Sequence, residues 1–296
     1  MPSVFAAPPL LIAGPTASGK SAYAMARARE RPSVIVNADS MQVYGDLQVL
    51  TARPSLEEQA GVPHRLFGHS DGAVAYSTGQ YVRELATVLI EAEGSGLWPI
   101  IIGGTGLYFR AILEGLSPVP EIPSQIRVQF RDMQREAGTG EVYRLLTERD
   151  PVMASRLKPS DPQRIVRALE VVEATGRSLS WWQSVPGTPI LHAEACERIV
   201  VSPDKETVQR RADERFDRMI ETGAVDEVKR LLLRELSPEL PVMRALGVPQ
   251  LAAYLRGEVA LDDAVTSSKL ETRAYIKRQR TWIKRNMSAW NIHKTQ

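Results

Sequence analysis

Residues 14–21 form a phosphate-binding loop. Their sequence, Gly-Pro-Thr-Ala-Ser-Gly-Lys-Ser, satisfies the pattern G-x-x-x-x-G-K-[ST] at every fixed position. In such a loop the glycines let consecutive backbone N–H groups point at phosphate oxygens, and the following helix adds its positive N-terminal end. Lys20 supplies a cation for the terminal phosphate, and Ser21 offers a hydroxyl to Mg²⁺. The loop predicts a diphosphate or triphosphate substrate but does not distinguish a kinase, an ATPase, a switch protein and a transferase.

The segments around this loop alternate between short apolar runs and helical stretches. Helices are expected at residues 19–30 and 79–93, and buried strands at residues 10–13, 34–36, 99–102 and 198–201. Strands that lack in/out alternation and are separated by helices are typical of a parallel sheet covered on both faces. The predicted fold class is therefore α/β: a P-loop NTPase-like parallel sheet with helices on both faces, plus a mostly helical insertion domain.

Three positions follow predicted strands within three residues: Gly14, Asp39 and Thr105. We expect them to meet at the carboxyl edge of the sheet, where open α/β sheets bind their ligands. Three interpretations of Asp39 are open from the residues alone: a carboxylate bound to Mg²⁺, a general base, or a cap of the next helix. The turn at residues 104–106 lets a ligand approach closely, but a Gly-Thr-Gly turn is weak evidence of function by itself.

The chain changes character after Leu116. Prolines at 118, 120 and 123 precede arginine-containing helical stretches, and a strand returns only near residue 198. We therefore expect a core made of residues 1–116 and 196–296, with residues 117–195 as a helical insertion. Within the insertion, Trp181 and Trp182 are interpreted as a buried aromatic pair, with stacking on nucleic-acid bases as the alternative. Helices are expected from residue 205 onward, with breaks at 237–241 and near 247–249.

Basic charge is concentrated at the C-terminal end. Formal net charge is only +2, yet residues 269–296 carry eight Lys and Arg against one Glu, a local charge of +7. Five of these cations share one helical face and form a stripe that suits a phosphate backbone: Lys269, Arg273, Lys277, Arg280 and Lys284. The insertion adds two arginine runs, one at 127, 131 and 135 and the other at 164 and 167. Together with the phosphate loop, these three runs favour nucleic acid as a partner.

The composition also bears on the compartment. One cysteine, Cys196, excludes an internal disulfide and is interpreted as a packed core residue. Residues 1–11 lack the positive charge that begins a secretory signal, and no stretch reaches the roughly 18 apolar residues that span a bilayer. A cytoplasmic protein without membrane contact is expected.

Six strings along nearly the whole chain resemble the signatures of the tRNA dimethylallyltransferase (tRNA isopentenyltransferase) family. They occur in the same order as in that family, which makes coincidence improbable. The strings are the phosphate loop 14–21, Asp-Ser-Met-Gln-Val-Tyr at 39–44, Gly-Gly-Thr-Gly-Leu-Tyr at 103–108, Asp-Pro-Gln-Arg-Ile-Val-Arg-Ala-Leu-Glu-Val at 161–171 with Thr-Gly at 175–176, Arg-Phe at 215–216, and Lys-Arg-Gln-Arg-Thr-Trp at 277–282.

This resemblance implies a reaction. A dimethylallyl group would pass from dimethylallyl diphosphate to N6 of the adenosine on the 3′ side of a tRNA anticodon (position 37). Asp39 would take the proton of the N6 amine, and Thr105 would orient the reacting groups. The loop, with Mg²⁺ at Ser21, would hold the departing pyrophosphate together with Arg215. The implied diphosphate-binding residues are Gly14, Pro15, Thr16, Ala17, Ser18, Gly19, Lys20, Ser21 and Arg215.

The resemblance also implies contacts with the tRNA anticodon stem-loop, which the insertion would share. The matching positions are Asp39, Ser40, Met41, Gln42, Thr105, Arg127, Gln163, Arg164, Ile165, Val166, Arg167, Arg244, Ala245, Leu246, Gly247, Val248, Pro249 and Lys277. At Val248 and Pro249 the chain departs from the family pattern, which has Tyr followed by Arg or Lys. That departure puts one tRNA contact in doubt but leaves the reaction intact. A monomer is expected.

Two other functions compete with this one. A P-loop kinase for a small molecule or nucleoside would use Lys20, Ser21 and Asp39 on Mg²⁺–ATP. An RNA-binding protein without enzymatic activity would use the loop only to sense a nucleotide. The length of the arginine-containing insertion and the charge of the C-terminal segment favour the transferase over the kinase.

Overall fold

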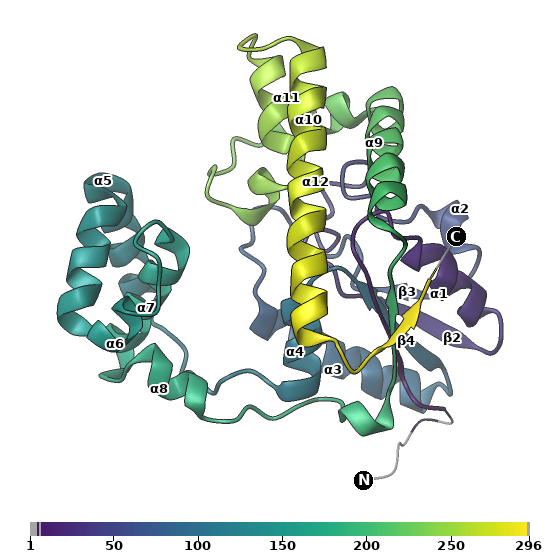
Figure 1. Cartoon of the computed structure of the whole chain (residues 1–296), viewed down its shortest axis with the longest axis horizontal. Helices are drawn as coiled ribbons and strands as arrows, with labels where there is room; N and C mark the ends of the chain where they lie inside the picture. Colours follow the sequence, from purple (N-terminus) through teal and green to yellow (C-terminus); the bar gives the residue numbers. More distant parts are fainter. Residues whose placement is uncertain (1–4, 6, 295–296) are drawn as a thin grey trace. The chain divides into compact units, whose positions relative to one another are not determined.

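A six-stranded sheet organises the core of the molecule (Figure 1). The computed structural model describes residue 5 and residues 7–294. The sheet order is β3-β2-β4-β1-β5-β6, and every neighbouring pair is parallel. The strands are β1 Leu10–Ala13, β2 Ser33–Asn37, β3 His64–Arg65, β4 Trp98–Gly103, β5 Glu197–Val201 and β6 Asn291–His293. The predicted parallel α/β sheet is confirmed, and β1 lies at its centre between β4 and β5.

Two edge strands were not predicted from the sequence. β3 has two residues and β6 has three, too few to produce a recognisable pattern. β3 pairs with β2 through Ile35 and His64, whereas β6 pairs with β5 through Val200 and Ile292. The last strand of the described chain, β6, therefore forms one edge of the sheet.

Alternate residues of the strands pack against different helices on the two faces. Leu11, Val36 and Ile101 belong to an apolar cluster with α3 (Thr78–Gly94) and α4 (Gly106–Glu114). Leu10 and Ile100 belong to another cluster, with α1 (Lys20–Ala28). Because both faces are covered, the strands are apolar throughout, which is why the sequence shows no alternation.

A second helical region of the core follows β5. Its members are α9 Lys205–Glu221, α10 Ala224–Leu232, the 3-10 turn Pro241–Arg244, α11 Val248–Leu255 and α12 Leu261–Asn286. Val43, Tyr44 and Leu47 from the loop after β2 share a buried cluster with these helices. Glu227 anchors the same loop from α10, since its carboxylate accepts the backbone N–H groups of Gln48, Val49 and Leu50 at 2.6–2.9 Å.

The chain divides into two compact units. One comprises Met1–Leu113 and Ile190–Gln296, and the other is Glu114–Pro189. The expected insertion began at 117 and ended at 195. The observed unit ends earlier because the N–H groups of Ile190 and Leu191 donate to Ile112 O at 3.0 and 3.2 Å, which returns the chain to the core before residue 195.

The unit Glu114–Pro189 has its own apolar core. It contains α5 Ser124–Arg149, α6 Pro151–Ala154, α7 Pro162–Thr175 and α8 Leu179–Ser184. Phe130, Leu146 and Leu169 are fully buried within it. The interpretation of Trp181 and Trp182 as a buried pair is wrong, since Trp181 is 42 % exposed and Trp182 is only half-buried.

Residues 1–4 and 6 belong to the N-terminal segment from which the absence of a signal sequence was predicted, and they lie outside the described residues. Within the described part of the chain, no helix combines the length and apolar character needed to cross a bilayer. Cys196 is half-buried and packs against the cluster around α3, and burial raises its pKa to about 11.

Candidate active site

The phosphate loop connects the central strand β1 to α1. Ser18 N–H donates to Pro15 O at 3.3 Å, and Gly19 adopts φ +87°, a left-handed conformation that favours glycine. The chain then enters α1 at Lys20, whose Nζ donates back to Pro15 O at 3.3 Å. The loop therefore curls around its own lysine at the N-terminal end of a helix, as a phosphate cradle requires.

Two cations converge on this loop. Arg215 reaches from α9, and its guanidinium donates to Thr16 Oγ1. Burial lowers the pKa of Lys20 to about 8, Asp39 acts in the opposite direction, and Arg215 lowers it further. Burial also lowers the pKa of Arg215. Two desolvated cations near one loop repel each other unless an anion joins them, so the loop is electrostatically suited to a diphosphate.

Asp39 lies in a tight turn directly after β2. Asn37 Oδ1 accepts its N–H at 2.8 Å, and Asn37 Nδ2 donates to Asp39 O at 2.9 Å. Asp39 Oδ1 accepts the N–H of Met41 at 3.0 Å. The next helix, α2 (Leu56–Gln59), is capped by Ser55. The interpretation of Asp39 as a helix cap is therefore wrong. The structure shows its carboxylate in a turn held by these hydrogen bonds.

Thr105 lies beside Asp39 at the end of β4. Its N–H donates to Ala38 O at 3.2 Å, and its Oγ1 accepts the N–H of Ser40 at 2.9 Å. Gly14 N–H donates to Gly103 O at 3.3 Å, which ties the phosphate loop to the same turn. The predicted meeting of Gly14, Asp39 and Thr105 at the carboxyl edge of the sheet is confirmed.

Comparison with known proteins identifies the family. The family model described as IPP transferase matches residues 42–286, and one described as isopentenyl transferase matches residues 9–72. The tRNA dimethylallyltransferase of Chelativorans sp. (strain BNC1) is 52 % identical, covering 94 % of this chain and 95 % of the relative. That of Azorhizobium caulinodans is 50 % identical, covering 95 % of this chain and 90 % of the relative. The chain belongs to the IPP transferase family.

Solved structures of family members have the same fold. The tRNA isopentenylpyrophosphate transferase of Bacillus halodurans is 28 % identical with a TM-score of 0.69, covering 96 % of this chain and 89 % of that one. A eukaryotic dimethylallyltransferase acting on tRNA is 25 % identical with a TM-score of 0.83, covering 98 % and 74 %. The chain is therefore a prenyl transferase, and the kinase alternative is excluded.

Positions in the core that match the family's tRNA contacts differ in exposure. Arg244, Pro249 and Lys277 are exposed, whereas Ala245 and Val248 are buried. Val248 packs in the apolar cluster around α10, and Pro249 occupies the first turn of α11, where its missing N–H costs nothing. Position 248 is thus a core position in this structure, and the departure from the family pattern changes the exposed surface only at Pro249.

The corresponding positions of the insertion are also mixed. Gln163 and Arg164 are exposed at the start of α7, but Ile165 and Val166 are buried in the core of this unit. A direct RNA contact by the Ile165 and Val166 side chains is therefore not available in this conformation. Arg127 is half-buried, and its Nε has no hydrogen-bond partner among the described residues.

Most arginines of the two insertion runs have acidic partners within the same unit. Buried Glu170 lies 3.8 Å from Arg131 and 3.4 Å from Arg167, while Arg135 pairs with Asp132 at 2.9 Å. Residues 114–189 contain ten Lys and Arg and ten Asp and Glu, so 10 − 10 gives a net charge of zero. The expected basic surface of this unit is reduced to individual side chains.

The basic stripe on α12 is divided into two parts. Lys269 pairs with Asp217 at 2.6 Å, and Arg273 pairs with Asp213, both acids coming from α9. Lys277 and Lys284, nearer the C-terminal end, are exposed and have no ion-pair partner in the described part of the chain. Only this end of the stripe retains its full attraction for phosphate.

Several site residues were not singled out from the sequence. Burial, followed by the negative charge of Asp39, raises the pKa of Tyr108 on α4 and of Tyr275 on α12. Gln279 bonds to the loops on both sides of the site. Tyr108 and Gln279 lie inside sequence strings that resemble the family, and Tyr275 lies next to one. Their position in or beside these strings was the sequence signal that could have identified them.

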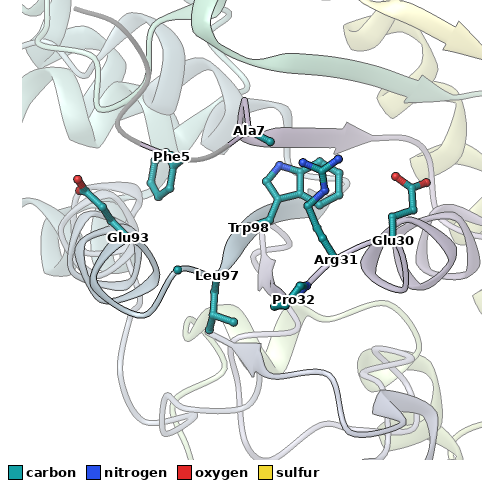
Figure 2. A pocket seen from close by; sticks show the side chains of 9 residues that line it. Phe5, Ala7, Glu30, Arg31, Pro32, Glu93, Leu97 and Trp98 are labelled. Atoms are coloured by element: carbon teal, nitrogen blue, oxygen red, sulfur yellow. The ribbon is translucent and has the colours of Figure 1, made fainter.

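A cavity of about 380 Å³ lies elsewhere, around Trp98 (Figure 2). Arg31 covers the Trp98 ring at 4.7 Å, and Pro32 and Trp98 lie at the amino ends of β2 and β4. This cavity is therefore at the opposite edge of the sheet from the phosphate loop and takes no part in the site.

Proposed function

We propose that this chain transfers a dimethylallyl group from dimethylallyl diphosphate to N6 of the adenosine on the 3′ side of the tRNA anticodon, releasing pyrophosphate. The observation that carries the proposal is the meeting of the phosphate loop with Asp39 and Thr105 at one sheet edge. A site for a departing diphosphate and a site for a base are therefore adjacent, as group transfer requires.

On the acceptor side, Asp39 takes a proton from N6 as the nitrogen attacks the allylic carbon. Its Oδ1 is engaged by Met41 N–H at 3.0 Å, so Oδ2 is the oxygen available to the amine. Thr105, fixed through Ser40 and Ala38, presents its hydroxyl beside this carboxylate. The N–C bond forms as the bond between the allylic carbon and the diphosphate oxygen breaks.

On the donor side, negative charge develops on the leaving pyrophosphate. The amides of the phosphate loop, Lys20 and Arg215 stabilise that charge without rearranging, because they are already held in place. The amine proton passes to Asp39 and the electron pair of the broken bond passes to pyrophosphate, so charge and atoms balance.

Mg²⁺ is proposed to accompany the diphosphate. Ser21 is exposed at the first turn of α1 and offers a hard oxygen donor. Ser21 would hold the ion, since a hydroxyl oxygen is a hard donor of the kind that Mg²⁺ binds. When bound, the ion neutralises charge on the diphosphate oxygens.

We further propose that the target adenine leaves its stack in the anticodon loop to reach Asp39. The exposed cations Arg164, Arg244 and Lys277 are proposed to contact the tRNA backbone and offset the cost of unstacking, a few kcal/mol. The protein is proposed to act as a cytoplasmic monomer.

A direct assay tests the reaction. The protein is incubated with Mg²⁺, dimethylallyl diphosphate and unmodified tRNA, and the nucleosides are then analysed by mass spectrometry. We expect one adenosine per tRNA to gain a five-carbon unit, and a matched tRNA with guanosine at that position to remain unchanged. Unshifted adenosine under these conditions would falsify the proposal.

A further inference from the structure

Gln279 connects two loops that are far apart in the sequence. Its Oε1 accepts the N–H of Thr16 in the phosphate loop at 3.0 Å, and its Nε2 donates to Gly104 O in the turn after β4 at 3.0 Å. The partners lie 263 and 175 residues away. Gln279 is only 6 % exposed, although neighbouring residues of α12 carry exposed cations.

The turn after β4 is shaped around this helix. A Cβ built on Gly104 would overlap Gln279 Nε2, and one built on Gly106 would overlap the ring of Trp282. The same Cβ on Gly104 would lie 3.4 Å from Asp39 Oδ2. Glycine at both positions lets α12 approach the turn, and Gln279 is thereby placed next to the carboxylate.

Both ends of the Gln279 amide contact groups that define the site. Thr16 is held twice, by Gln279 at its N–H and by Arg215 at its hydroxyl. Gly104 directly precedes Thr105, whose hydroxyl is bonded to Ser40. One side chain therefore bonds both the loop for the leaving group and the turn that carries the acceptor-side hydroxyl.

We propose that Gln279 is a positioning residue that sets the separation between the diphosphate loop and the Asp39–Thr105 side of the site. The inference rests on the proposed transfer reaction, since this separation determines how the allylic carbon faces N6. Gln279 needs both functions of its amide, an acceptor for Thr16 and a donor for Gly104. A small displacement of reacting groups costs about 10²-fold in rate.

Two variants test the role of the amide. Gln279→Met keeps the length of the side chain but loses both hydrogen bonds. Gln279→Glu keeps the acceptor for Thr16, but its carboxylate cannot donate to Gly104 O unless it is protonated. Glu271→Gln, an exposed change two turns earlier on α12, is the matched control. Rates are normalised to the folded fraction measured by circular dichroism at the assay temperature.

For Gln279→Met we expect kcat to fall by about 10²-fold, with KM for tRNA changing less than about threefold. For Gln279→Glu, the ratio of its kcat to that of the wild type should rise as pH falls from about 8.5 to about 6, by up to about tenfold per unit. Protonation of the introduced carboxyl restores the donor. The charged and titratable groups Asp39, Lys20, Arg215 and Tyr275 are present near this region in both proteins, so the ratio reports the effect of the introduced carboxyl.

The possible outcomes separate the proposals. Wild-type protein that prenylates no tRNA overturns the proposed reaction itself. An active wild type with a flat Gln279→Glu ratio, or with Gln279→Met within about twofold of wild-type kcat, overturns the positioning role. If Gln279→Met does not fold, the pH dependence of the Gln279→Glu ratio decides alone, because Glu has nearly the same shape as Gln.

Discussion

Ser40 and Thr105, which are 65 residues apart, exchange hydrogen bonds across the site. The backbone N–H of Ser40 donates to Thr105 Oγ1 at 2.9 Å, and the Thr105 hydroxyl donates to Ser40 Oγ at 3.3 Å. A hydroxyl has one donor and two acceptor positions. Thr105 therefore retains one free acceptor position, which suits an amine N–H of the incoming base.

Replacing Thr105 tests this arrangement. Thr105→Val keeps the shape but leaves the Ser40 N–H without its acceptor, and we expect kcat to fall by about 10- to 100-fold. Thr105→Ser keeps the hydroxyl and should stay within about threefold of the wild type. Steady-state kinetics with tRNA as the varied substrate checks both, and equal loss in the two variants would contradict the hydrogen-bonding role.

Asp39→Asn removes the base and preserves the turn. The amide oxygen of Asn can still accept the N–H of Met41, so the fold should be unchanged. We expect kcat to fall by about 10²- to 10⁴-fold, the typical contribution of a general base. Binding of tRNA, measured by filter retention, should stay within about twofold. Near-normal turnover would show that Asp39 is not the base.

The lowered pKa of Lys20 predicts that diphosphate binding depends on pH. Its pKa is lowered from the ordinary value of 10.5 to about 8, so the free protein loses this charge as pH rises through about 8. Binding of an anion restores the proton. Titration calorimetry with inorganic pyrophosphate near pH 8.5 is repeated in buffers of different ionisation enthalpy. The wild type should take up about 0.8 proton more than Lys20→Met.

The lowered pKa of Lys20 also makes the free energy of unfolding depend on pH. The unfolded chain keeps Lys20 protonated up to about pH 10.5, and the folded protein binds fewer protons between pH 8 and 10.5. The contribution of Lys20 to the free energy of unfolding therefore rises with pH across that window. Urea unfolding at both ends of the window should show this rise in the wild type relative to Lys20→Met, and a rise of equal size in the variant would contradict it.

Lys277 and Lys269 form a matched pair on α12. Lys277 is exposed without an ion-pair partner among the described residues, whereas Lys269 pairs with Asp217 at 2.6 Å. Lys277→Ala should lower the slope of log K for tRNA against log salt by about one. Lys269→Ala should leave this slope nearly unchanged, because its charge is already compensated. Equal changes would indicate that the whole stripe contacts phosphate.

Glu227 is predicted to stabilise the loop after β2. Glu227→Gln turns an amide N–H₂ toward at least one of three backbone N–H groups and should lower the free energy of unfolding by about 1–3 kcal/mol. Asp226→Asn is the control, since it removes an equal charge from the same first turn of α10 but at an exposed position. Urea unfolding of both variants measures the difference, and equal losses would assign the effect to the helix dipole.

The parts of the fold that the sequence predicted are those set by local pattern. The strands at 10–13 and 99–102 are continuous apolar runs ended by glycines, and both were placed within one residue at each end. The loop at 14–21 carries its chemistry in adjacent residues. β3 and β6 have no such signal, because pairing with an existing sheet edge makes a strand of two or three residues.

Contacts between side chains from distant segments could not be predicted from local sequence patterns. Counting arginines alone predicted a basic insertion, although the equal number of acidic residues and the local pair Arg167–Glu170 could be read from the sequence. The contact of Glu170 with Arg131 forms only when α5 and α7 pack together. Burial of Ile165 and Val166 follows from the helical face that α7 turns inward. Gln279 and Glu227 act on loops far away in the chain, so their roles depend on the tertiary structure.

The hydrogen bonds of Thr16 with Arg215 and Gln279 can form only late in synthesis on the ribosome. Thr16 emerges early, but Arg215 follows 199 residues later and Gln279 follows 263 residues later. At about 5–20 residues per second, the nascent chain carries the loop without Gln279 for roughly 13–50 s. During that interval the loop lacks its hydrogen bond to Gln279, and an incomplete chain released from the ribosome would carry the phosphate-loop motif without a complete active site.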